Sequence, residues 1–224
     1  MIILLFLSFL ISLASGWLVS KYGIKLGFSD LPNERSLHTI ETPRGGGLGV
    51  VISCSLIISI LGILGRLDIQ LILALLCGGI IIAIIGLLDD YQPVAVRWRI
   101  LIHFVAVCWA VVLIDGFQTI NIGIGILHLG WLGSLLAVIG IVWLINLYNF
   151  MDGIDGIAGI EAIFVAGFGG VLLALSGEWD LAYLCWGITF ASGGFLVWNW
   201  QPAKIFMGDV GSGPLGFIFG VLAV

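Results

Sequence analysis

Charged residues are scarce in this chain. Only 9% of its 224 residues are Asp, Glu, Lys or Arg, whereas soluble domains carry about 25%. Cysteine and proline are also rare, with four and five copies. The cysteines stand singly and without Cys-x-x-Cys spacing, so neither a disulfide framework nor a zinc site is indicated. The shortage of charge excludes a water-soluble globule, and the excess of apolar residues excludes a disordered chain.

Apolar residues make up 61% of the chain, and the mean hydropathy is +1.23. A membrane-spanning helix needs about 20 such residues. The first apolar run, Met1 to Leu10, lacks a basic flank and a cleavage site, so we interpret it as a retained helix and not a signal peptide. The pattern predicts an all-α polytopic membrane protein, with residues 1–224 forming a single transmembrane domain. We expect about eight spans, near residues 1–20, 47–65, 70–88, 99–114, 131–148, 157–176, 180–198 and 210–224.

The connections between these spans alternate between two sides of the membrane. Seven of the eight basic residues fall on one side, and Arg66 alone falls on the other. Cytoplasmic loops carry the excess of Lys and Arg, so the sequence predicts an N-terminus outside. Eight of the 13 acidic residues share the basic side, and only Glu161 lies within a span. Four polar segments are therefore expected on the cytoplasmic face.

The first segment runs from Asp30 to His38 and continues through Pro43-Arg44 into three glycines. Glycine lets backbone N–H groups approach an anion closely. Arg35, His38 and Arg44 add cationic donors, and the arginine fork suits phosphate. The alternative is a basic loop that sets topology, with its glycines packed at a helix interface.

The second segment is the pair Asp89-Asp90 at the end of the third span. Two carboxylates at a helix C-terminus meet an unfavourable dipole and require a cation. That cation is either a hard metal such as Mg²⁺, which takes oxygen ligands, or the nearby Arg97 and Arg99. Two solvated interfacial charges are the simpler alternative.

The third segment carries Asn149, Asp152 and Asp155. The two aspartates lie three residues apart and would share one face of a helical turn. An acidic residue before a helix also serves as an N-cap, so a capping role and a binding role both stay open.

The fourth segment extends from Asn199 to Ser212 and places Asp209 between glycines at the start of the last span. An anion or a metal–phosphate could be held there. Phe206 could stack on a base or serve as an interfacial anchor.

Together the four segments resemble the polyprenyl-phosphate N-acetylhexosamine-1-phosphate transferases, a superfamily within glycosyl transferase family 4. The Pro-Arg-Gly-Gly-Gly form is closer to the N-acetylglucosamine-1-phosphate branch than to the peptidoglycan branch. The matching elements, in family order, are Asp30-x-Pro-Asn-x-Arg35-x-x-His38, Pro43-Arg44-Gly-Gly-Gly, Leu88-Asp89-Asp90, Asn149-Phe-x-Asp152-Gly-Ile-Asp155-Gly, and Asn199 with Pro202-Ala and Phe206-Met-Gly-Asp209-x-Gly-Ser212.

The resemblance implies transfer of a sugar-1-phosphate from a UDP-N-acetylhexosamine to a membrane polyprenyl phosphate, with release of UMP. It implies Mg²⁺, or alternatively Mn²⁺, with Asp209 as principal ligand and with Asp89 and Asp90 supporting the metal and handling the lipid phosphate. The nucleotide-sugar would be held by Asn149, Asp152, Asp155, Asn199 and Phe206, and Arg35, His38 and Arg44 would contribute to substrate binding.

The resemblance also implies a place in the bacterial cytoplasmic membrane, in a pathway of cell-wall, O-antigen or lipopolysaccharide synthesis. The expected partners are the nucleotide-sugar, the lipid and the bilayer, with no nucleic acid, and the glycine-rich spans permit a homodimer. Family members usually continue for about two more spans with a histidine-rich cytoplasmic loop. This sequence stops before them, so we expect either a fragment truncated at the C-terminus or a protein that has lost part of its site. The alternatives are an inactive fragment or homologue that serves as an assembly subunit and, less favoured, a transporter.

Overall fold

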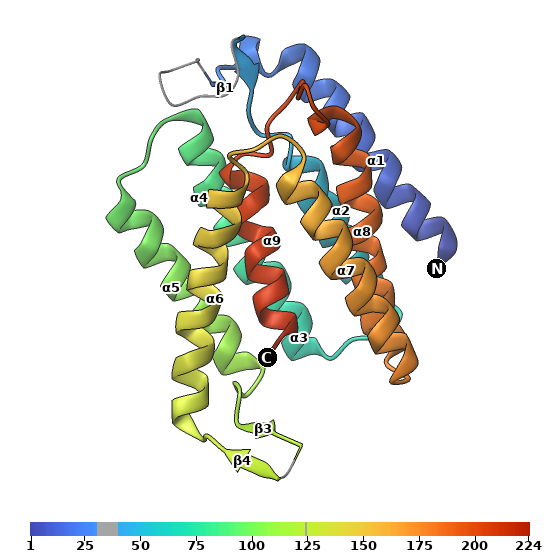
Figure 1. Ribbon diagram of the computed structural model, residues 1–224, viewed down its shortest axis with the longest axis vertical. Coiled ribbons are helices and arrows are strands. Elements are labelled where there is room, and N and C mark those ends of the chain that lie inside the picture. The colour runs from blue at the N-terminus through green and yellow to red at the C-terminus, as the bar shows by residue number, and fades with distance from the viewer. Residues whose placement is uncertain (31–39, 124) are drawn as a thin grey trace.

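The computed structural model describes residues 1–30, 40–123 and 125–224, and these form a helical bundle (Figure 1). Arg35 and His38 lie outside the described residues. A π-helical stretch, Ala74–Gly78, joins the helices Ile69–Leu73 and Gly79–Tyr91, and a 3₁₀ turn, Ile24–Leu26, follows the helix Ile2–Tyr22. The helices are α1 (Ile2–Tyr22), α2 (Leu48–Ile63), α3 (Ile69–Leu73), α4 (Gly79–Tyr91), α5 (Val96–Leu113), α6 (Trp131–Met151), α7 (Ile157–Leu175), α8 (Trp179–Asn199) and α9 (Asp209–Leu222).

Two short antiparallel strand pairs complete the described structure. β1 (Ser29–Asp30) pairs with β2 (Thr42–Pro43), and β3 (Thr119–Asn121) pairs with β4 (Ile126–His128). In Figure 1 β1 lies at the top of the bundle and the β3–β4 pair at the bottom.

An apolar helical segment occupies each of the eight predicted spans, which confirms the all-α polytopic membrane class. Within the described ranges, six segments are long and apolar enough to cross a bilayer. The other two, α2 and α9, have 16 and 14 residues. At 1.5 Å per residue α9 is about 21 Å long, less than the ~30 Å of hydrocarbon.

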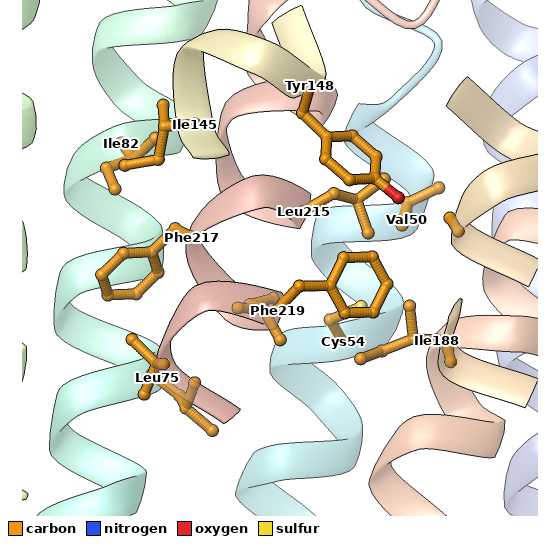
Figure 2. Close-up of a cluster of buried hydrophobic side chains, with 14 of the residues drawn as sticks. Val50, Cys54, Leu75, Ile82, Ile145, Tyr148, Ile188, Leu215, Phe217 and Phe219 are labelled. Atoms are coloured by element: carbon orange, nitrogen blue, oxygen red, sulfur yellow. The ribbon is translucent and has the colours of Figure 1, made fainter. Parts of the chain in front are cut away.

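Helix α9 can be short because other helices surround it. It packs against α4, α6 and α2, and every residue from Val210 to Val221 is buried. Figure 2 shows Leu215, Phe217 and Phe219 of α9 among apolar side chains of its neighbours. A helix that is apolar on all sides belongs in the interior of a bundle.

Contact between α4 and α9 is closest at Gly86. A Cβ atom added there would collide with the backbone carbonyl of Asp209, so only glycine lets the two helices approach this far. Asp89 and Asp90 follow Gly86 by one turn. The same close approach therefore brings the second and fourth polar segments together.

Four connections of the bundle lie at the end that carries β1: those between α1 and α2, α4 and α5, α6 and α7, and α8 and α9 (Figure 1). These are the four polar segments that charge counting places on one face. The opposite end carries the β3–β4 pair and an ion pair between Arg66 and Asp180, whose Nη1 and Oδ1 atoms are 2.8 Å apart.

Candidate active site

The N-terminus of α9 is the centre of the polar cluster. Its N-cap residue is Gly208, which has no side chain to accept the first N–H groups of the helix. Asp90 of α4 accepts them instead. Its Oδ1 receives the N–H of Asp209 at 2.9 Å, and its Oδ2 receives the N–H of Val210 at 3.0 Å. A carboxylate at this position satisfies two otherwise free donors and complements the positive end of the helix dipole.

Gly208 is required at this point for two reasons. Its φ of +74° is one that other residues rarely adopt. An added Cβ would also meet the carboxylate of Asp90. The glycine before Asp209 therefore belongs to the geometry of the site.

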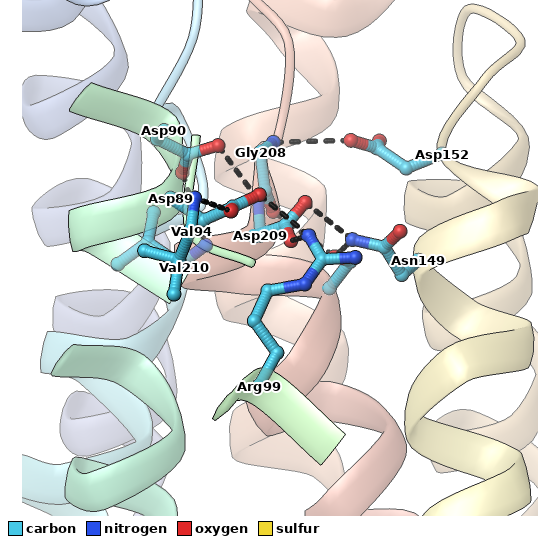
Figure 3. A network of polar contacts seen from close by, with 10 residues as sticks. Asp89, Asp90, Val94, Arg99, Asn149, Asp152, Gly208, Asp209 and Val210 are labelled. Atoms are coloured by element: carbon cyan, nitrogen blue, oxygen red, sulfur yellow. Dashed lines mark hydrogen bonds and ion pairs between the residues drawn. The ribbon is translucent and has the colours of Figure 1, made fainter. Parts of the chain in front are cut away.

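Asp152, just beyond the end of α6, binds the same turn from the other side. Its Oδ2 accepts the N–H of Gly208 at 3.0 Å (Figure 3). Burial raises the pKa of the Asp152 carboxyl well above its ordinary value. The hydrogen bond from Gly208 opposes that shift, whereas the nearby charges of Asp90 and Asp209 raise the pKa further.

Asp209 faces two polar side chains from other helices. Asn149 of α6 donates a hydrogen bond from Nδ2 to Oδ1 of Asp209, and the same amide nitrogen lies 3.4 Å from the hydroxyl of Ser212. Arg99 of α5 places Nη1 2.7 Å from Oδ2 of Asp209. Both oxygens of the carboxylate are therefore oriented from outside α9.

Arg99 also contacts Asp89. The same Nη1 atom lies 2.5 Å from Oδ2 of Asp89, whose Oδ1 accepts the N–H of Val94 at 2.7 Å. Of the two arginines that the sequence offered as an alternative to a metal, Arg99 is the one that contacts the aspartate pair, through Asp89. Arg97 is exposed, with its guanidinium 5.7 Å from the centre of the Trp98 ring. Arg99 was considered only as a counter-charge and was not among the predicted site residues.

Asp155 and Asn199 connect two of the loops. Asp155 accepts the N–H of Ala203 at 2.9 Å. The buried amide of Asn199 accepts the N–H of Gly156 at 2.9 Å and donates to the carbonyl of Ile205 at 2.9 Å. These contacts tie the α6–α7 loop to the segment that leads into α9. The two residues stay predicted binding residues, and their visible contacts are with backbone.

Phe206 and Arg44 lie beside β2, one hydrogen-bonded to it and the other directly after it in the chain. The N–H of Phe206 donates to the carbonyl of Pro43 at 2.9 Å, and the ring is half-buried. Arg44 pairs with Asp30 at 2.7 Å, and its charge acts on Asp152, whose pKa it lowers. The first polar segment therefore contacts the segment that leads into α9 through the backbone of Pro43.

The resemblance predicts a divalent metal, which would need oxygen ligands at this cluster. Among the described residues, no group of three or more His, Cys, Asp or Glu side chains is arranged to hold a metal ion. Magnesium, however, often takes only one or two carboxylates and completes its shell with water and substrate phosphates. Asp89 and Asp209 fit that requirement, because one oxygen of each already converges on a single cationic atom. Both oxygens of Asp90 are engaged by α9.

Comparison with known proteins gives a consistent family assignment. The model of glycosyl transferase family 4 matches residues 72–224. A probable undecaprenyl-phosphate N-acetylglucosaminyl 1-phosphate transferase of Bacillus subtilis is 32% identical over 214 residues, which cover 92% of this chain and 58% of that protein. A phospho-N-acetylmuramoyl-pentapeptide-transferase of Moorella thermoacetica is 32% identical over 156 residues, covering 63% and 49%. The chain thus spans about half the length of these two curated relatives.

Proposed function

This chain belongs to glycosyl transferase family 4, and we propose that it transfers N-acetylhexosamine-1-phosphate from a UDP-sugar to polyprenyl phosphate and releases UMP. The reaction would start a lipid-linked precursor of a cell-envelope polysaccharide. We place it at the cytoplasmic face of the bacterial inner membrane, because seven of the eight basic residues fall on the same predicted side of the membrane as the four polar segments.

One observation carries this proposal. Asp90 and Asp152, from two other polar segments, both accept hydrogen bonds from the turn that carries Asp209, so three aspartates meet at the start of α9. Carboxylates are costly at the edge of a bilayer, and a structural cap for α9 needs only one of them. Their convergence is explained if the turn helps to hold a cation that neutralises the phosphates of the two anionic substrates.

The chemistry requires charge neutralisation and positioning more than proton transfer. An oxygen of the lipid phosphate attacks the phosphorus that carries the sugar, and the bond from that phosphorus to UMP breaks. The second pKa of the acceptor phosphate is about 6, so the acceptor is largely a dianion already and needs little help from a general base. In-line positioning of two anions is then the main task of the protein.

The residues divide this task. Asp90 holds the first turn of α9 in place, and Asn149 orients the carboxylate of Asp209. Asp89 and Asp209 would bind Mg²⁺, or Mn²⁺, which when bound would neutralise charge on the diphosphate. Asp152, Asp155, Asn199 and Phe206 form the region that we assign to the nucleotide-sugar. Arg44 is assigned to substrate binding as well, and Arg35 and His38 are assigned to it on the sequence resemblance alone.

The proposal is tested by Asp209→Asn. The substitution keeps the shape of the side chain and an oxygen for Asn149, but it removes the charge. We expect UMP release from a UDP-N-acetylhexosamine and undecaprenyl phosphate to fall by about 10²–10³-fold or more, as when a transition-state charge partner is lost. Asp180→Asn is the matched control at the opposite end, where it breaks only the exposed pair with Arg66. Equal rates of UMP release in the two variants would contradict the proposed function.

A further inference from the structure

The guanidinium of Arg99 occupies the point on which Asp89 and Asp209 converge. A single atom, Nη1, makes both contacts, at 2.5 Å to Oδ2 of Asp89 and 2.7 Å to Oδ2 of Asp209 (Figure 3). These are the same two oxygens that the proposed function assigns to a divalent cation. The side chain of Arg99 is 24% exposed, that of Asp89 15% and that of Asp209 24%, so the three groups are largely shielded from water.

Arginine and a divalent metal cannot both occupy this position. Magnesium binds carboxylate oxygens at about 2.0–2.1 Å, and in that case its positive charge would stand where the guanidinium nitrogen now lies. Two cations at such a distance repel strongly in a partly desolvated site. Binding of the metal therefore requires Arg99 to move away from at least one of the two carboxylates.

The pairing has a clear benefit for the metal-free protein. Asp89, Asp90, Asp152 and Asp209 gather at one turn, and charge repulsion among unpaired carboxylates destabilises such a cluster. Arg99 neutralises two of them through charge-assisted contacts of the strong kind. It therefore stabilises the fold in the absence of metal and lowers the apparent affinity for the metal by the same interaction.

We propose that Arg99 is a resident counter-cation that competes with the divalent metal for Asp89 and Asp209 and is displaced when the metal binds. This inference rests on the metal of the proposed function. Competition and positioning predict opposite effects of Arg99 on the affinity for the metal. A residue that only positions the carboxylates would strengthen metal binding, whereas a competitor weakens it.

The test measures Mn²⁺ binding by electron paramagnetic resonance, without turnover, on the protein in lipid nanodiscs. Arg99→Met removes the charge and keeps an apolar stem of similar length. We expect it to bind Mn²⁺ about tenfold more tightly than the unmodified protein, within the usual range of coupling between two ligands. Arg99→Gln, which keeps hydrogen-bond donors but not the charge, gives the same comparison if the methionine variant does not fold.

Arg97→Met is the matched control. It removes the same charge from the same helix, but at an exposed position outside the cluster. We expect its affinity for Mn²⁺ to stay within twofold of the unmodified protein. If Arg97→Met tightens binding as much as Arg99→Met, the effect is one of net charge and the inference is overturned.

Thermal unfolding supplies a second measurement. In the absence of metal, Arg99→Met should unfold at a lower temperature than the unmodified protein. Saturating Mn²⁺ should restore most of the lost unfolding temperature. Weaker or unchanged Mn²⁺ binding in Arg99→Met would overturn the competition and leave the proposed function standing. Absence of Mn²⁺ binding in every variant would overturn the metal of the proposed function and the competition with it.

Discussion

The carboxylate of Asp90, near the end of α4, accepts the N–H of Val210, in the first turn of α9, at 3.0 Å. The two residues are 120 positions apart in the chain. Through this contact the last turn of one helix supplies the cap of another, so the site and the packing of the bundle depend on the same side chain.

Replacing Asp90 by alanine should therefore destabilise the protein. The change leaves the N–H groups of Asp209 and Val210 without acceptors in a buried place, which costs about 1–3 kcal/mol. We expect a lower midpoint of thermal unfolding in detergent, followed by circular dichroism. Asp180→Asn should lose less than about 1 kcal/mol, because exposed ion pairs contribute little. A midpoint for Asp90→Ala equal to that of the control would show that the cap contributes nothing.

Gly208→Ala tests whether the turn before α9 tolerates a side chain. The new Cβ meets the carboxylate of Asp90, and the φ of +74° adds backbone strain. Gly177 has a φ of +89° with no atom within 4 Å of an added Cβ, so Gly177→Ala reports the strain alone, about 1–3 kcal/mol. We expect the unfolding midpoint of Gly208→Ala to be the lower of the two. UMP release should be lost only in Gly208→Ala, and equal behaviour of both variants would contradict the role of the contact.

Asp152 predicts a dependence of stability on pH. Because its pKa is raised in the folded state, the folded protein holds the proton more tightly than the unfolded chain. The free energy of unfolding should therefore fall as the pH rises from the ordinary aspartate value of about 3.9 through the folded-state pKa. Asp152→Asn keeps an oxygen for the N–H of Gly208 but cannot ionise, so its unfolding midpoint should depend less on pH.

The unfolding midpoints of the unmodified protein and of Asp152→Asn are measured between pH 4 and pH 8. The two midpoints should diverge as the pH rises. Asp180→Asn, altered in the same way at the opposite end, should follow the unmodified protein. Parallel profiles for Asp152→Asn and the unmodified protein would be inconsistent with a raised pKa at this residue.

The orientation in the membrane can be measured by cysteine labelling in a variant without the four native cysteines. Ile154, in the α6–α7 loop, is 52% exposed, and Ile126, in β4 at the other end, is 64% exposed. We expect an impermeant thiol reagent to label Ile126→Cys on intact cells, and Ile154→Cys only after the membrane is opened. The reverse pattern would place the site outside and contradict the proposed cytoplasmic location.

The sequence alone was sufficient to predict the eight apolar segments and the common end of the four polar connections. Both depend on local quantities, namely the length of an apolar run and the position of charges beside it. It was also sufficient for the order of the motifs, from which the family was inferred and then confirmed. The residues of the site that belong to short sequence motifs could therefore be predicted without coordinates.

The tertiary structure decided which polar atoms meet. From the sequence, Asp89 and Asp90 were an equivalent pair, yet Asp90 caps α9 and Asp89 faces Arg99. Asn199 was predicted to bind the nucleotide-sugar, and in the structure its amide joins the α6–α7 loop to the segment that leads into α9. The difference between Asp89 and Asp90 depends on how closely α4 approaches α9, which glycine at position 86 permits. Hydrophobic length determines where each helix crosses the membrane, but only the packing of side chains between helices determines which carboxylate is left to bind a cation.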